Sequence, residues 1–176
     1  MRSATALRDL DFDELFILSG LLQVPGNIAK EFVLDVGQSW AWLREAVRDL
    51  QGMSLDEWQR EYVELFLRRG TEISCPPYES DYCVEDPADA CAVRLAEIHM
   101  LAGVPVSNMP PDYIGSELRL LAQLLEYDTQ ADPALAEELW GRLRAWVPRF
   151  AADLEQRSRL SLYRALGRRL AQIFTG

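Results

Sequence analysis

The segment CPPYESDYCVED, residues 75–86, gathers side chains that could do chemistry: two cysteines, two tyrosines and four carboxylates, with no basic residue. A third cysteine, Cys91, and the only histidine, His99, continue the spacing of eight that separates Cys75 from Cys83. Thiolate and imidazole groups are the usual ligands of zinc. The pattern therefore raises a small helical metal- or thiol-dependent redox protein using Cys75, Cys83, Cys91 and His99 as one interpretation.

Helical geometry argues against a single metal site built from all four residues. Cys91 and His99 fall on one predicted helix, about 12 Å apart along its axis and roughly 80° apart around it. Structural zinc sites instead use short C-x(2–4)-C pairs. We expect Cys91 in the core, His99 at the helix surface or satisfied locally, and Cys75 and Cys83 as reduced loop thiols. No metal or other cofactor is predicted.

Catalysis needs a nucleophile beside a base that a third group orients. The chain has one histidine and no Ser or Cys elbow motif. Glu79 and Asp81 could act as an acid–base pair, but exposed loop acids are usually only solvated. We therefore expect a binding protein rather than an enzyme.

The formal charge of −10 is unevenly distributed along the chain. Residues 141–176 hold eight arginines and two acids, a local balance of +6, which leaves −16 on the rest. A helical DNA-binding regulator could use only this arginine-rich tail, whereas arginines on the wet face of an amphipathic helix explain it more simply. The acidic remainder suits a cationic partner.

Apolar residues recur at helical spacing along nearly the whole chain, and no convincing stretch alternates as a strand would. We expect one all-α domain over residues 1–176, a bundle of about six to eight helices. The amino terminus lacks the features of a signal peptide, and no run approaches the roughly 20 apolar residues of a membrane span. A cytoplasmic location is expected.

Capping and breaking residues predict where these helices begin and end. Ser54 and Glu57 fit a capping box, Asp112 resembles the cap of a helix, and Pro148 should kink or break one. The predicted ranges are about 11–22, 27–50, 54–69, 86–102 and 158–174, and two further helices are expected to begin at Asp112 and, with Asp132 as the cap, at Asp132-Pro133. One apolar stripe is expected along 27–50, formed by Ile28, Phe32, Val36, Trp40, Leu43 and Val47.

The acidic loop at about 70–86 follows a helix with an unusually aromatic face, which carries Trp58, Tyr62, Leu65 and Phe66. Core packing is the simpler explanation for Leu65 and Phe66. Tyr62, Tyr78 and Tyr82 fit partner contact better, because tyrosine joins an apolar body to a polar tip.

Five short motifs, in this order, resemble the TorD/DmsD family of redox-enzyme maturation chaperones over about residues 10–174. They are EYVELF at 61–66, PPYES at 76–80, AGV at 102–104, PPDYI followed by EL at 110–118, and the L-x-x-W-x-P-x-F run from Leu143 to Phe150. The resemblance implies an all-α chaperone without catalysis of its own. Such a protein binds the twin-arginine signal peptide and the apo form of a molybdopterin oxidoreductase subunit, before cofactor loading and export.

The resemblance also implies a client-binding surface. An acidic loop and an aromatic groove would complement an arginine pair followed by an apolar segment. Carried over by motif position, the binding residues are Tyr62, Leu65, Phe66, Pro77, Tyr78, Ser80, Pro110, Asp112 and Tyr113.

This chain departs from the family pattern at two positions, where Tyr113 and Arg142 replace histidines that the family often has. Any role that needs an imidazole at either position would be lost. The family also exchanges its carboxy-terminal part between chains, so a homodimer is implied, with Pro148 and residues 128–132 as plausible hinges.

Overall fold

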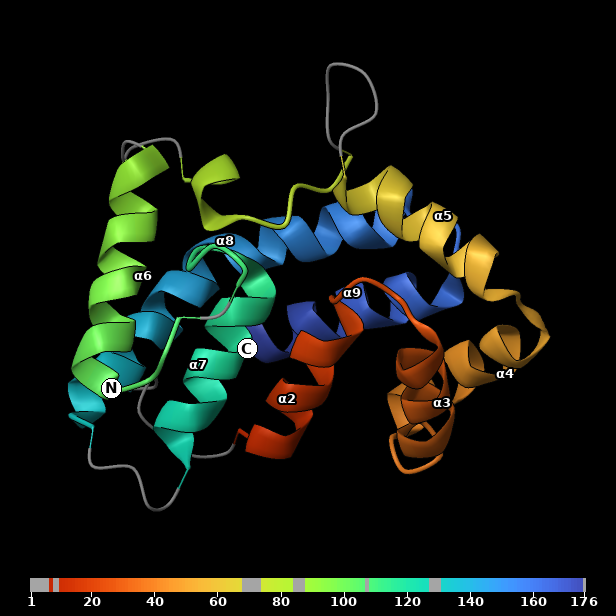
Figure 1. Cartoon of the computed structure of the whole chain (residues 1–176), viewed down its shortest axis with the longest axis horizontal. Coiled ribbons are helices and arrows are strands. Elements are labelled where there is room, and N and C mark those ends of the chain that lie inside the picture. Colours follow the sequence, from red (N-terminus) through yellow and green to blue (C-terminus); the bar gives the residue numbers. More distant parts are fainter. Residues whose placement is uncertain are drawn as a thin grey trace. The chain divides into compact units, whose positions relative to one another are not determined.

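The computed structural model describes Leu7 and residues 10–67, 74–83, 88–106, 108–126 and 131–175. Its α-helices, labelled in Figure 1, are α2 (Phe12–Leu21), α3 (Asn27–Val36), α4 (Arg44–Gly52), α5 (Leu55–Phe66), α6 (Ala88–Ala102), α7 (Ile114–Leu125), α8 (Pro133–Arg157) and α9 (Ser161–Thr175). Two short 3-10 helices, η1 (Ala41–Leu43) and η2 (Glu79–Asp81), complete the set. No strand occurs among these residues, so the predicted all-α class is confirmed. In the described part of the chain, no helix is both long and apolar enough to span a membrane.

The chain divides into two compact units. Unit 1 contains the residues up to Leu22 and Tyr78–Trp146, whereas unit 2 contains Gln23–Pro77 and Val147–Thr175. Helix α8 belongs to both, because its first part lies in unit 1 and its second part in unit 2.

Unit 1 is built around the packing of α2 against α7, which lie side by side in Figure 1. Asp11 caps α2 by accepting a hydrogen bond from the Asp13 backbone N–H at 2.9 Å. The Ser19 hydroxyl of α2 donates to the carbonyl of Gly115 in α7 at 2.8 Å. Leu15 of α2 and Leu118 of α7 are 1% and 0% exposed, so both helices contribute apolar side chains to the core of unit 1.

Unit 2 packs α4 and η1 against α9, with α5 held to the carboxy-terminal helices through buried polar contacts. The predicted capping box is present, since Ser54 and Glu57 satisfy each other's backbone N–H groups. The Trp58 indole N–H donates to the Tyr163 hydroxyl at 2.9 Å within the core. Burial raises the pKa of that phenol.

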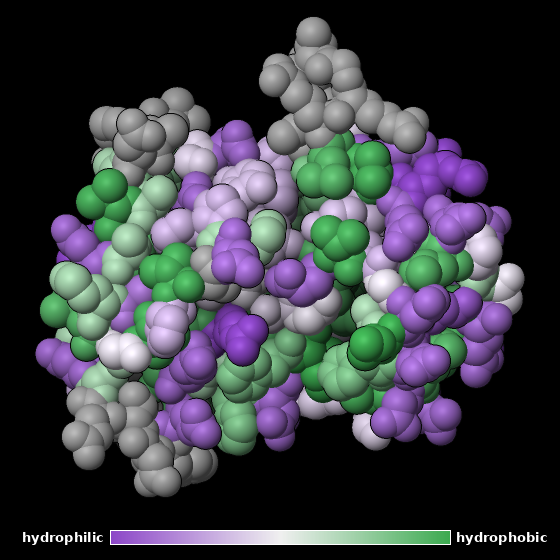
Figure 2. All heavy atoms as spheres, viewed as in Figure 1, coloured by the Kyte–Doolittle hydropathy of each residue, from purple (hydrophilic) through white to green (hydrophobic). Residues whose placement is uncertain are grey.

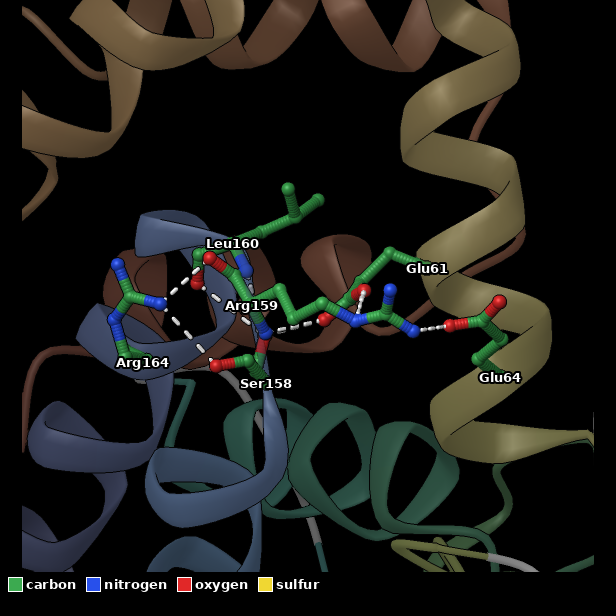
Figure 3. Close-up of polar contacts among 6 residues, drawn as sticks. All are labelled: Glu61, Glu64, Ser158, Arg159, Leu160 and Arg164. Carbon is green, nitrogen blue, oxygen red and sulfur yellow. Dashed lines mark hydrogen bonds and ion pairs between the residues drawn. The ribbon is translucent and has the colours of Figure 1, made fainter.

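A second polar link in unit 2 joins α5 to the turn between α8 and α9, as Figure 3 shows. The buried Glu61 carboxylate accepts hydrogen bonds from the Ser158 hydroxyl, at 3.0 Å, and from the Arg159 backbone N–H. The Arg159 guanidinium, which is exposed, pairs with Glu64 on the next turn of α5. A buried carboxylate thus fixes the α8–α9 turn, because loss of these donors would leave Glu61 unsatisfied.

The single helix predicted over 27–50 is wrong, because α3 ends at Val36 and helix resumes only at η1 and α4. Gly37 lies at the break, where a Cβ would be 2.1 Å from Val47 Cγ2. The predicted stripe fails with the helix: Leu43 and Val47 are buried, but Ile28 is 84% and Phe32 46% exposed. Val33 occupies the buried face of α3 instead.

Pro148 was predicted to kink or break its helix, and α8 continues through this residue without a break. Asp132 caps the helix as expected, accepting from the Ala134 backbone N–H at 2.9 Å. The start predicted at Asp86-Pro87 and most of the 128–132 hinge fall outside the described residues. Gly103 ends α6 as predicted, with a φ of 68° that glycine adopts without strain.

Candidate client-binding site

A single antiparallel bridge in unit 1 brings two of the predicted sequence motifs together. Tyr78 pairs with Tyr113, and their rings lie 5.8 Å apart between centroids. The Glu79 backbone N–H donates to the Asp112 carbonyl at 2.9 Å. The segment that begins with Tyr78 therefore lies against the residues preceding α7.

Asp112 has a different role from the one predicted. The N-cap residue of α7 is Tyr113, and no side chain caps this helix. The Asp112 carboxylate instead accepts a hydrogen bond from the Ser80 hydroxyl at 2.7 Å, and the residue is only 6% exposed. The expected cap is wrong because the carboxylate is one residue too early and is engaged across the bridge.

Tyr113 is buried, and its hydroxyl donates to the carbonyl of Leu22 at the end of α2. A carbonyl at a helix end has no intrahelical donor, so this contact satisfies a group that would otherwise lack one. The tyrosine that replaces the family's histidine thus ties the start of α7 to the end of α2.

Arg142, the second departure from the family pattern, reaches from α8 to the same segment. Its Nη2 lies 2.7 Å from Glu79 Oε2, and both side chains are largely or fully buried. Glu117 of α7 is completely buried nearby, and burial followed by the charge of Glu79 raises its pKa well above the usual value. Neither Glu117 oxygen has a well-formed hydrogen bond in the described part of the chain, although the Trp146 indole lies near. Burial therefore favours the protonated, neutral form of Glu117.

The accessible part of this region is small and acidic. Tyr78 and Ser80 are half-buried, whereas Asp81 and Pro110 are exposed. Partial burial, with the Asp112 charge as a second cause, raises the pKa of both Asp81 and Tyr78. A cation placed near these two carboxylates would favour the charged form of Asp81. The acids Glu72, Glu85 and Asp86 of the predicted loop lie outside the described residues.

The other predicted contact residues belong to unit 2, where they form part of the core. Tyr62, Leu65 and Phe66 are each about 2% exposed. The Phe66 ring packs edge-on against Tyr163 at 5.3 Å and lies 5.0 Å from Tyr62. Pro77 is also buried. The predicted contact residues therefore fall into two groups. Unit 1 brings together Tyr78, Ser80, Asp112 and Tyr113, with Pro110 two residues before Asp112. Unit 2 contains Tyr62, Leu65, Phe66 and Pro77.

Exposed apolar side chains occur where sequence reasoning expected a buried stripe. Ile28 and Phe32 are one helical turn apart on α3, and Val24 just before the helix is 64% exposed. Figure 2 shows apolar groups of this kind interspersed among polar ones on the face in view. The sequence gives no signal that Val33 is buried and Ile28 is exposed, because periodicity alone cannot say which apolar face is covered.

Cys91 is buried in α6 and Cys83 is a reduced thiol in a loop, both as expected. His99 is satisfied locally at one nitrogen, since Nδ1 lies 3.3 Å from the Val104 carbonyl, whereas its buried Nε2 has no hydrogen bond within the described part of the chain. Burial lowers the pKa of His99. Cys75 is not an exposed loop thiol: it is fully buried, and burial raises its pKa to about 12. The Cys75 backbone N–H donates to the carbonyl of Leu65 in α5 at 2.8 Å, which fixes Cys75 next to this helix.

The all-helical fold is similar to that of a solved structure. A solved structure from Archaeoglobus fulgidus, described as a candidate redox enzyme maturation protein, is 22% identical, covers 95% of each chain and superposes with a TM-score of 0.73. Such a likeness shows the fold. A search among curated proteins finds no match.

The family model described as "Nitrate reductase delta subunit" matches residues 29–152. The chain belongs to this family, and the TorD-type resemblance seen in the sequence is confirmed. The findings support a molybdoenzyme maturation chaperone as the class of protein.

Proposed function

We propose that the protein is a cytoplasmic chaperone that binds the twin-arginine signal peptide and the apo form of a molybdopterin oxidoreductase subunit. In this role it assists cofactor loading and prevents premature export, without catalysis of its own. Family membership supports a client related to nitrate reductase. The observation that carries the proposal is the Asp112 carboxylate, which the Tyr78–Tyr113 bridge presents beside Ser80 and near Asp81.

Charge complementarity favours this part of unit 1 for the arginine pair. A guanidinium that meets a carboxylate forms a charge-assisted hydrogen bond, worth roughly 1.5–3 kcal/mol. Partial burial, and after it the charge of Asp112, raises the pKa of the Asp81 carboxyl, so a cation near both residues would relieve unfavourable charge. The net charge of −10 adds long-range attraction for a basic peptide.

The remaining predicted residues divide by accessibility. Tyr78, Ser80 and Pro110 offer exposed or half-exposed surface for contact, and Tyr113 positions Asp112. Tyr62, Leu65, Phe66 and Pro77 are buried, so in this conformation they contribute by packing. Homodimerisation by carboxy-terminal exchange stays a proposal, which light scattering would test.

The deciding experiment is calorimetry with a synthetic signal peptide and the Asp112→Asn variant. Asparagine keeps the shape and an oxygen for Ser80 but removes the charge. We expect the variant to bind at least about tenfold more weakly, since a factor of ten corresponds to 1.4 kcal/mol. A peptide with both arginines replaced by glutamine should bind wild type and variant equally.

Asp132→Asn is the matched control, because it removes one carboxylate charge at an exposed helix cap of the same unit. Asparagine also caps helices well, so this variant should keep both stability and peptide affinity. Equal binding of the native peptide by Asp112→Asn and wild type would mean that Asp112 is structural and that the arginine site is elsewhere.

A further inference from the structure

Three side chains with metal-binding atoms meet in unit 1. The Glu79 carboxylate and the Cys83 and Cys91 thiols bring one ligand atom each to within 4.8 Å of one another. Glu79 and Cys91 are 2% and 1% exposed, and Cys83 is half-buried. The cluster is therefore enclosed but open on the side of Cys83.

The local backbone fixes two of the three residues relative to each other. The Cys83 backbone N–H donates to the Glu79 carbonyl at 3.0 Å, which closes a helical turn across η2 and puts both side chains on one side. Cys83 Sγ lies 3.8 Å from Glu79 Oε1. Cys91 comes from the first part of α6, against which η2 packs.

From these contacts we infer a divalent-metal site, with Zn²⁺ as the preferred ion, held by Glu79, Cys83 and Cys91. In tetrahedral zinc sites with Zn–S near 2.3 Å and Zn–O near 2.0 Å, ligand atoms lie roughly 3.3–3.8 Å apart. The Glu79–Cys83 pair already has this separation, and the remaining pairs need side-chain movements of about 1 Å or less. Two sulfur ligands select a thiophilic ion over Mg²⁺ or Ca²⁺.

Arg142 is placed to hold the Glu79 ligand in position without itself contacting the metal. It holds Glu79 Oε2 at 2.7 Å, while Oε1 faces Cys83. Metal-bound carboxylates are commonly oriented by a hydrogen bond of this kind. Metal binding releases the two thiol protons, so the ion, two thiolates, the carboxylate and the guanidinium together carry no net charge. A neutral set is the least costly one to bury.

This site differs from the four-residue arrangement that the cysteine spacing suggests. Cys75 belongs to unit 2, and His99 lies two helical turns beyond Cys91, beside Val104. Three protein ligands leave a fourth position for water or an added ligand, on the accessible side. The metal would clamp the segment after Tyr78 onto α6.

Cobalt titration of the reduced, chelator-treated full-length protein tests the inference. We expect one Co²⁺ per chain, with the intense near-ultraviolet band of thiolate ligation and the visible bands of a tetrahedral site, both removed by one equivalent of Zn²⁺. Cys83→Ser and Cys91→Ser should each weaken Co²⁺ binding by at least about 100-fold. Removing a residue that only hydrogen-bonds to a metal ligand typically weakens metal binding less than this. Cys75→Ala, the matched thiol control in the other unit, should bind like wild type.

X-ray absorption of the zinc-loaded wild type provides a readout that does not depend on any variant folding. Two sulfurs at about 2.3 Å with oxygen or nitrogen at about 2.0 Å are expected. A shell without sulfur would overturn the site, as would cobalt bands that survive Cys91→Ser or require Cys75. Reduced wild type that binds no Co²⁺ and forms only a Cys83–Cys91 disulfide on oxidation would also overturn it.

Discussion

The two groups of predicted client-binding residues differ sharply in what surrounds them. In unit 1, Ser80 and Asp112 form a polar pair at the edge of accessible surface, held by a bridge between two loops. In unit 2, Tyr62 and Phe66 interlock with other rings and are almost completely buried. Both groups were selected by the same family resemblance, but their physical roles differ. The unit 1 pair offers a carboxylate charge, whereas the unit 2 aromatic residues pack in the core and support α5.

The strongest test of this contrast is Phe66→Ala. The substitution leaves a cavity where the Phe66 ring contacts the rings of Tyr62 and Tyr163. It should destabilise the protein by about 3–5 kcal/mol. Urea unfolding measures the loss. Peptide affinity at a temperature where the variant is folded should change little. A variant that unfolds like wild type but no longer binds peptide would make Phe66 a contact residue.

Cys75→Ser, in the same buried region of unit 2, should have the next largest effect. The sequence predicted only a reduced loop thiol, but Cys75 is fully buried, and a hydroxyl there would lack the solvation it needs. We expect a loss of about 1–3 kcal/mol. Cys75→Ala should cost less, because it buries no polar atom. Equal melting temperatures for the serine variant and wild type would mean that Cys75 reaches solvent.

The cysteine comparison shows what sequence could and could not supply. Helix caps at Asp11, Ser54 and Asp132 were predictable because they depend on contacts within a few residues. The burial of Cys75 was not, because it depends on a backbone contact with Leu65, ten residues earlier in the chain. Local signals predict helix ends, whereas burial in a loop depends on tertiary packing.

The break between α3 and α4 has a similar explanation. Apolar residues continue at helical spacing across it, so periodicity favoured one helix over 27–50. Gly37 was the available signal: its lack of a side chain permits close approach to Val47 and to the Val33 carbonyl, which a Cβ would meet at 2.7 Å. Only the structure shows that the approach occurs.

The candidate site was predictable as a set of motifs but not as an arrangement. Sequence reasoning selected Ser80 and Asp112 from their motifs, yet assigned Asp112 to a helix cap. Their hydrogen bond joins residues 32 positions apart, and spacing cannot indicate such a partner. Glu79 was treated as a solvated loop acid, whereas its pairing with Arg142 requires α8 to lie against the segment.

The smallest expected effect belongs to Ser80→Ala, which separates the two roles that the Ser80–Asp112 pair could have. The substitution removes the donor to Asp112 Oδ2 and leaves the carboxylate in place. Because Ser80 is only half-buried, water can replace much of the lost bond, so we expect a stability loss of about 0.5–1.5 kcal/mol. If the charge of Asp112 binds the client's arginine, this variant should keep affinity within about threefold of wild type, well under the tenfold that corresponds to 1.4 kcal/mol. Calorimetry on Ser80→Ala and Asp112→Asn with the same peptide measures both. Equal weakening by the two substitutions would show that the geometry of the pair, rather than the charge, determines binding, because only Asp112→Asn removes the charge.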